Sequence, residues 1–402
     1  MKKINIILAA IMMMAVINKS NANDIYVEEN GFGGAYKHIA DACAAAQSGD
    51  RILVVPRANN AYYNEGYFFY IPANCKMISA VAGQRFNFSI NTFYAEGNNF
   101  ISMANIEGYL ETGDNCWITN CIVSSNISGG NNLHCDNDSL PNSNDEISIG
   151  SGRISGCYAT WIVIQYNIPD NIIDTTFIVG NWITQGIQTV NISNYPPVKY
   201  LYVANNYIGG GFTAIDGLCP GGLGMNTIIN NIFIDLQTSY SDGITISGTN
   251  NNSPTNVTIE NNLFINPFTY FHTPIAVVYI SQPHTSESQI SYNYVNFNNS
   301  SSNYTFAYGF TPDNTNHFTS NITIDGQGHL IAGSDAINGG DPFAGYFDLD
   351  LTRNDAGMYG GSFSMSNFNT PGIGNPRVLF MTAPRTLFTT QSANISADGV
   401  SK

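Results

Sequence analysis

A six-residue pattern, apolar-x-Asn-Asn-x-apolar, recurs along the chain and constrains its fold more than any other feature. The clearest copies are I-I-N-N-I-F at 228–233 and I-E-N-N-L-F at 259–264. Weaker copies are centred on Cys121, Cys157, Asn206 and Asn293, and a degenerate copy is expected near Thr176. Stretches of unequal length separate the copies, which indicates a repeated structural element joined by variable loops.

The repeated element is predicted to be a β-strand, because its residues alternate with a period of two and are rich in Ile, Val, Tyr, Phe and Thr. Short strands repeated in this way are typical of a parallel β-helix, whose coils stack about 4.8 Å apart. Asn at one position of every coil would form a hydrogen-bonded ladder. A β-sandwich with Asn-rich turns is the alternative, but its strands would not repeat one pair at one phase. We expect an all-β solenoid of roughly eight to ten coils.

One segment has a helical pattern instead. Residues 35–46 place Ile39 and Cys43 four apart on one face, and Gly49-Asp50 ends the segment before an apolar strand at 52–55. A solenoid needs a cover over its first coil to prevent association through the open edge, and this helix would supply it. The predicted divisions are therefore a leader at 1–22, an N-terminal cap at 23–50, a β-helix at 51–361 and a C-terminal tail at 362–402.

The leader has the pattern of a signal peptide. Lys2 and Lys3 precede an apolar run at 4–17, and small residues end it at Ser20-Asn21-Ala22. The run is shorter than the roughly 20 residues that span a bilayer, so we expect cleavage after Ala22 and no transmembrane segment in the mature chain. The expected location is the extracellular medium, the cell surface or the periplasm.

The cysteines and the charge limit the chemistry further. Export would place the chain where thiols can oxidise, and it has 7 cysteines, so at least one stays unpaired in a monomer. Both buried free thiols and one or two disulfides remain open, Cys121 with Cys157 being the candidate pair. The net charge of −15 would repel phosphate backbones, so nucleic acid is not an expected partner.

The order of helix, Gly49-Asp50-Arg51 strand and Asn-Asn coils behind a signal peptide resembles secreted bacterial right-handed parallel β-helix proteins of the pectin-lyase-like superfamily. Residues 348–361, D-L-D-L-T-R-N-D-A-G-M-Y-G-G, are similar to the closing motif of such proteins, with Leu351 and Met358 replacing the usual Gly and Ala. The resemblance implies that Arg353 pairs with Asp348, Asp350 or Asp355. It also implies a polysaccharide partner, since the superfamily includes polysaccharide lyases, glycoside hydrolases and adhesive proteins.

A second pattern suggests one line of side chains. The pattern is a polar residue followed by Gly or Pro and then by an apolar residue. It begins at Gln185, Asp216, Asp242 and Thr273, at spacings close to those of the Asn pairs. On neighbouring coils, Asp216 and Asp242 would be close enough for the two carboxylates of a glycoside hydrolase. Asp-Gly is equally the ordinary chemistry of a turn, and that alternative stays open.

Two further groups of residues are candidates for binding. The aromatic loop around Asp242 could stack on sugar rings or simply pack on the coil; with Gln185, its predicted substrate-binding residues are Tyr240, Tyr270, Phe271 and His272. An apparent polar insertion at 131–146 offers the oxygen ligands that Ca²⁺ prefers, or is a solvated acidic loop. Its candidate ligands are Asp136, Asp138, Asp145 and Glu146.

The sequence thus predicts an exported β-helix that contacts polysaccharide and favours non-catalytic binding or adhesion. The alternatives are a glycoside hydrolase or polysaccharide lyase acting on an extracellular glycan, and a passive surface or matrix protein. The pectate-lyase motif W-x-D-H and the polygalacturonase set with N-T-D are both missing from the chain, which weakens the enzymatic alternatives.

Overall fold

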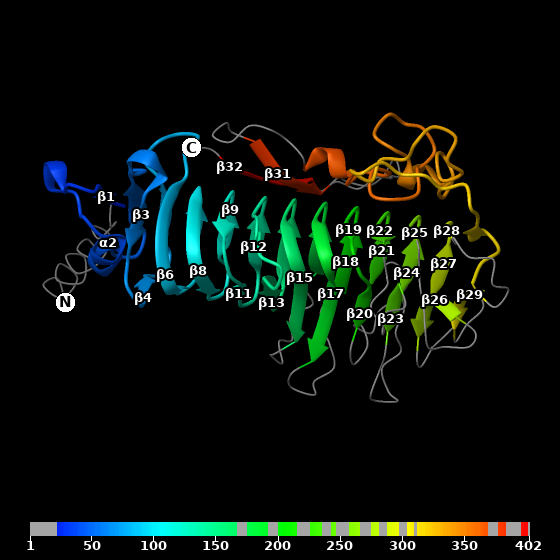
Figure 1. Ribbon diagram of the computed structural model, residues 1–402, viewed down its shortest axis with the longest axis horizontal. Helices are drawn as coiled ribbons and strands as arrows, with labels where there is room; N and C mark the ends of the chain where they lie inside the picture. The colour runs from blue at the N-terminus through cyan, green and yellow to red at the C-terminus, as the bar shows by residue number, and fades with distance from the viewer. Residues whose placement is uncertain are drawn as a thin grey trace, which may run out of the picture.

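The chain folds into a parallel β-helix solenoid, as the repeat predicts (Figure 1). The computed structural model describes residues 22–166, 175–191, 200–214, 226–234, 243–246, 257–265, 275–280, 288–296, 304–308, 312–368, 377–382 and 395–400. Within these ranges almost every strand pairs in parallel with the strand of the next coil.

One face of the solenoid is a continuous sheet of 12 parallel strands, which we call sheet A. This exceeds the eight to ten coils expected, because several coils lack a recognisable Asn pair. The strands, in order along the sheet, are β1 Asp24–Val27, β2 Arg51–Val54, β5 Lys76–Ser79, β7 Phe100–Ser102, β9 Trp117–Thr119, β12 Leu133–Asp136, β14 Gly152–Ser155, β16 Thr175–Val179, β18 Tyr200–Ala204, β21 Thr227–Ile229, β24 Thr258–Glu260 and β27 Gln289–Ser291.

The remaining strands of the coils, which we call sheet B, complete the wall. Long strands turn a corner within one coil: β6 pairs with β3 before the corner and with β4 after it. The strands of sheet B are β3 Tyr62–Asn64, β4 Phe68–Ile71, β6 Phe86–Ala95, β8 Ala104–Thr112, β10 Ile122–Val123, β11 Ile127–Gly129, β13 Glu146–Ile149, β15 Tyr158–Tyr166, β17 Trp182–Asn191, β19 Tyr207–Ile208, β20 Phe212–Ala214, β22 Ile232–Ile234, β23 Ile244–Ile246, β25 Leu263–Ile265, β26 Ile275–Ile280, β28 Tyr294–Asn296, β29 Tyr304–Tyr308 and β30 His317–Phe318.

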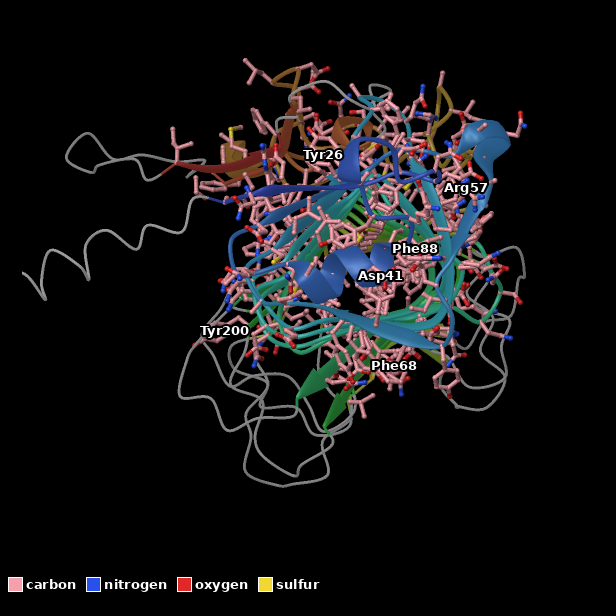
Figure 2. The ribbon with its side chains drawn as sticks, turned by 90° about the vertical axis from the view of Figure 1, so that its left-hand side faces the viewer. Tyr26, Asp41, Arg57, Phe68, Phe88 and Tyr200 are labelled. Atoms are coloured by element: carbon pink, nitrogen blue, oxygen red, sulfur yellow. The ribbon has the colours of Figure 1, made fainter. Side chains whose placement is uncertain are left out.

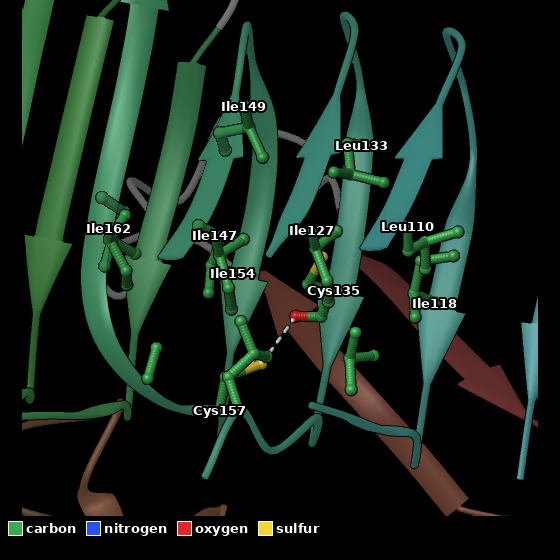
Figure 3. Close-up of a cluster of buried hydrophobic side chains, with 14 of the residues drawn as sticks. Leu110, Ile118, Ile127, Leu133, Cys135, Ile147, Ile149, Ile154, Cys157 and Ile162 are labelled. Carbon is green, nitrogen blue, oxygen red and sulfur yellow. Dashed lines mark hydrogen bonds between the residues drawn. The ribbon is translucent and has the colours of Figure 1, made fainter. Parts of the chain in front are cut away.

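The hydrophobic core runs along the inside of the solenoid (Figure 3). Because side chains alternate across a strand, every second residue of each coil points inward and stacks on its equivalent in the next coil. Viewed from the N-terminal end, Phe88 lies inside the ring of strands and Phe68 lies outside it (Figure 2). The inward row of sheet A consists of Ile52, Met77, Ile101, Ile118, Cys135, Ile154, Ile178, Val203, Ile228, Ile259 and Ile290, all buried.

The predicted cap is present as helix α2, Ile39–Ala45, which contacts β1, β2 and β4 across the N-terminal opening (Figure 2). The helix begins later than the predicted residue 35, because the backbone of Tyr36 is already hydrogen-bonded to Tyr26 and Glu28. The buried carboxylate of Glu65 accepts hydrogen bonds from the N–H groups of Ile39 and Ala40. Strand β1 is the first strand of sheet A, so the sheet starts inside the segment predicted as cap.

The predicted asparagine ladder is confirmed. Asn206, Asn231 and Asn262 lie on successive coils, flanked by strands in register. In each step the main-chain N–H and the side-chain Nδ2 donate to Oδ1 of the next Asn, over 2.9–3.0 Å. The full ladder is Asn181, Asn206, Asn231, Asn262, Asn293 and Asn316. Its member Asn181 replaces the copy expected near Thr176, which lies five residues earlier in β16.

In the coils that precede Asn181 along the chain, residues other than Asn occupy the ladder position. Asp138 Oδ1 accepts a hydrogen bond from Cys121 N–H, and Asp138 N–H donates to Cys157 Sγ. A coil therefore separates the two cysteines that were candidates for a disulfide. All six cysteines in the described part of the chain are free and buried, and Cys219 lies outside it.

After the last coil, the chain folds back along the outside of the solenoid (Figure 1). This C-terminal segment, residues 319–368, has little regular structure apart from the 3-10 turns η3 Ala344–Tyr346 and η4 Met365–Asn367. The outward residues Ile232, Leu263 and Tyr294 form a second hydrophobic cluster with it. A hairpin of β31 Arg377–Thr382 and β32 Ser396–Val400 follows, and Asp398 of β32 forms an ion pair with Arg153 of β14.

The closing motif belongs to this segment and does not form the last coil. Arg353 does not form the predicted ion pair with Asp348, Asp350 or Asp355. Its Nε donates to the carbonyl of Gly340 over 2.6 Å, and its guanidinium lies 5.9 Å from the centre of the Tyr292 ring. The 3-10 turns η1 Phe32–Gly34 and η2 Ala58–Asn60 complete the elements, and no helix in the described ranges has the length and apolarity to span a bilayer.

Candidate binding surface

Most of the residues predicted to bind or cleave a glycan lie outside the described part of the chain. These are Asp216, Asp242, Tyr240, Tyr270, Phe271 and His272. Gln185 is described: it is exposed on β17, directly before Gly186.

The alignment that placed these residues on one line is wrong at all three of its steps. It implied that the residues two positions further on, Ile187, Leu218, Ile244 and Ile275, are partners on successive coils. Instead Ile187 pairs with Phe212, Phe212 with Ile244, and Ile244 with Val278. The loops between the ladder and the next strand differ in length, so counting from the Asn pair does not preserve the register.

The polar segment at 131–146 is a coil of the solenoid and not an insertion. Arg153 holds both carboxylate oxygens of Asp136, with Nε to Oδ1 at 2.8 Å and an outer guanidinium nitrogen to Oδ2 at 2.7 Å. Asp138 is inside the ladder, while Glu146 begins β13 and Asp145 precedes it. Within the described ranges no three His, Cys, Asp or Glu side chains gather as metal ligands, so the structure does not assemble the predicted Ca²⁺ set.

Within the described ranges, the densest group of exposed aromatic side chains lies beside the corner of β6 and β8, where β4 begins. Tyr67, Phe68 and Tyr70 are 73%, 53% and 50% exposed. Tyr70 stacks on Tyr94 of the next coil, with ring centres 4.9 Å apart, and Phe68 meets Tyr70 edge-to-face at 5.6 Å. We call Tyr67, Phe68, Tyr70 and Tyr94 the aromatic cluster. Exposed apolar groups gathered in this way make the cluster a candidate binding surface.

The positions of these rings follow from the strand period. In Tyr67-Phe68-Phe69-Tyr70, Phe69 points into the core, so Phe68 and Tyr70 point outward. Burial within the cluster, and then the negative charge of Glu111, raise the pKa of Tyr94. Glu111 is the partner of Tyr94 on the next coil and is exposed.

A groove of about 570 Å³ lies at the same corner. Gly108 allows its floor to form, because a Cβ there would lie 1.8 Å from the carbonyl oxygen of Ile90 on the neighbouring coil. The groove is lined by Gly66, Ser89, Ile90, Asn91, Thr92, Glu107, Gly108, Tyr109, Ser124 and Ser125.

The groove walls supply hydrogen-bonding groups and one charge. Hydroxyl and amide side chains predominate, and Glu107 is the single carboxylate among the lining residues. Cleavage of a glycosidic bond by the common mechanism needs two carboxyl groups on opposite sides of the bond. Among its lining residues the groove thus presents one carboxyl group together with hydroxyl and amide groups.

From the cluster, one row of outward positions continues along the solenoid. We call it the outer row: Phe68, Thr92, Tyr109, Asn126, Glu146, Trp161 and Gly186. Trp161 is 36% exposed, and a Cβ on Gly186 would lie 3.0 Å from its Cζ3, so the indole rests on the backbone of the next coil. The outer row thus runs from the aromatic cluster to Trp161.

This surface was missed by the sequence reasoning, although Glu146 and Gln185, selected for other reasons, lie on or next to the outer row. The signal was the run of aromatic residues at 67–70 and 93–94, which lie in coils without a copy of the six-residue pattern. Sequence alone does not show that these strands are neighbours.

The fold and the surface define a parallel β-helix protein with a cluster of aromatic side chains on one corner of the solenoid. Comparison with protein-family models and with curated proteins finds no match to this chain.

Proposed function

We propose that this protein binds a polysaccharide through the aromatic cluster and the adjoining groove, without cleaving it there. The observation that carries the proposal is exposed Tyr70 stacked on half-buried Tyr94, beside a groove lined by hydroxyl and amide groups. Sugar rings present apolar C–H faces to aromatic rings and hydroxyl groups to polar side chains.

The resemblance of the helix, the coils and the closing motif to the pectin-lyase-like superfamily supports the same class of partner. Export supports it as well: we propose that residues 1–22 are removed and that the protein acts outside the cytoplasm, where structural polysaccharides occur. Sequencing the N-terminus of the purified mature protein tests this point, and the expected first residue is Asn23.

The binding proposal is tested on a glycan array with wild type, a Tyr70→Ala/Tyr94→Ala double variant and a Phe32→Ala control. Phe32 is an exposed aromatic residue outside the cluster, 87% accessible. The double variant should lose about tenfold or more in affinity, equivalent to about 1.4 kcal/mol, and the control should bind like wild type.

Release of reducing ends is measured in the same samples. Equal binding by the double variant would contradict the proposal. Cleavage that disappears in Asp216→Asn or Asp242→Asn would instead place the function at those carboxylates.

A further inference from the structure

We infer that the ligand is an extended glycan with free amino groups, lying along the solenoid axis on the outer row. This inference rests on the proposed function and specifies its ligand. It follows from two independent properties of the surface, its length and its charge.

The outer row has the geometry of a track for a linear chain. Phe68 and Trp161 are separated by five steps from coil to coil, through Thr92, Tyr109, Asn126 and Glu146. Each step is about 4.8 Å, which is comparable to the length of one sugar unit in an extended polysaccharide. A chain along the axis would therefore meet an equivalent backbone position at every sugar, with aromatic rings at both ends of the track.

The charge of the track selects the type of sugar. Glu107 lies in the groove, Glu111 beside Tyr94, and Glu146 next to Trp161 on the adjacent coil. The strands that carry the track, β4, β6, β8, β11, β13 and β15, contain no Lys, Arg or His. Uronic acids would meet three carboxylates and no cation, whereas the ammonium group of a glucosamine unit would gain charge-assisted hydrogen bonds from them.

The experiment uses the dimer, tetramer and hexamer of glucosamine, the hexamer of N-acetylglucosamine and the hexamer of galacturonic acid, titrated at pH 6 by calorimetry. Affinity for the glucosamine series should increase with length. Trp161→Ala should weaken the hexamer about tenfold and leave the dimer unchanged, because only the longer chain reaches from the cluster to Trp161.

Glu146→Gln tests the charge separately. It should weaken the glucosamine hexamer and reduce the salt dependence of its binding, while the N-acetylated hexamer should be unaffected. Phe32→Ala is the matched control for Trp161→Ala, and circular dichroism of each variant confirms the fold.

Two outcomes overturn the inference. One is equal or tighter binding of the N-acetylated or galacturonate hexamer. The other is a glucosamine hexamer insensitive to Trp161→Ala. In both, binding that still depends on Tyr70 and Tyr94 would leave the proposed function standing, whereas no binding of any oligomer or array glycan would remove both.

Discussion

At the residue scale, the two asparagines of each Asn-Asn pair have different structural roles. The first residue has a positive φ, as in Asn205, Asn230 and Asn261, and turns the chain between the two sheets. Its side chain points outward: Asn230 Nδ2 donates to Asn354 Oδ1 over 2.8 Å and so holds the C-terminal segment. The second residue points inward and forms the ladder. The pair therefore joins the coils to each other and to the segment outside them.

Replacing Asn231 with Leu should destabilise the protein by about 1–3 kcal/mol, because buried donors and acceptors lose their partners. Asn231 Nδ2 donates to the carbonyl of Val203 and to Asn262 Oδ1, and its Oδ1 accepts from Asn206. Denaturant unfolding followed by circular dichroism measures the loss. Asn144→Leu, at an exposed position, is the control and should change stability little.

Asp138 should make stability depend on pH. Its carboxyl group is inside the ladder and its Oδ2 has no hydrogen-bond partner; burial first, and then the charge of Asp136, raise its pKa well above the ordinary value of 3.8. The folded state thus holds this proton more tightly than the unfolded state. The contribution of Asp138 to the free energy of unfolding is complete when the pH is below its ordinary pKa, and it is lost as the pH rises toward its folded-state pKa.

Asp138→Asn should remove this slope and stabilise the protein at neutral pH by about 1–3 kcal/mol, since the amide is uncharged and its Oδ1 still accepts from Cys121 N–H, so no carboxylate charge is buried. Unfolding free energies measured across pH 4 to 8 test it, with the exposed Asp41→Asn as the comparison. A variant that keeps the wild-type slope would mean that another group is responsible.

At the element scale, the C-terminal segment is fastened along the turns of sheet A. Asn261 Oδ1 accepts from the N–H of Asp341, and the carbonyl of Met358 accepts from Asn205 Nδ2. Further along, Phe368 lies over Gly156 and Gly180, which take the place of the first Asn in their coils. The identity of the turn residue thus follows from what covers it.

Gly180→Ala should release the segment near Phe368. A Cβ at Gly180 would lie 2.0 Å from Phe368 Cδ2, and the φ of +64° adds strain of about 1–2 kcal/mol. Limited proteolysis should then cut residues 362–368 faster, with a drop in unfolding free energy. Gly33→Ala is matched, because Gly33 has a φ of +67° and no atom within 4 Å of its Cβ position.

At the scale of the whole molecule, the solenoid is a stack in which each coil protects the edges of its neighbours. The first coil has no such neighbour, and α2 covers it. Without that cover, the open end offers buried apolar residues and free strand edges to a second copy.

Glu65→Ala should therefore promote association. It removes the buried acceptor for the first N–H groups of α2, so the helix loses an anchor of its N-terminus. Light scattering after size-exclusion chromatography should show oligomers that increase with concentration. Glu96→Ala, which removes an exposed carboxylate, should stay like wild type, and a monomeric Glu65→Ala would show that the cap is held by its apolar contacts alone.

The features that could be predicted from the sequence are those whose pattern lies within a short stretch of chain. The Asn pairs, the period of two and the helix before Arg51 are local, and they correctly predicted the solenoid, the ladder and the cap. The Asp138 coil was read as an insertion because its ladder residue is not Asn. The line through Gln185 was misplaced because loop lengths between strands do not set the register; the contacts between coils do.

The sequence by itself determined the period, the stacking direction and the inward residues, since these follow from the alternation of side chains along each strand. Only the tertiary structure decided which outward residues meet. Tyr94 lies one coil beyond Tyr70, Trp161 lies one coil beyond Glu146, and Asn354 lies 124 residues beyond Asn230. The first two pairs depend on the register between neighbouring coils and the third on the path of the C-terminal segment, and the summed packing of the core sets both.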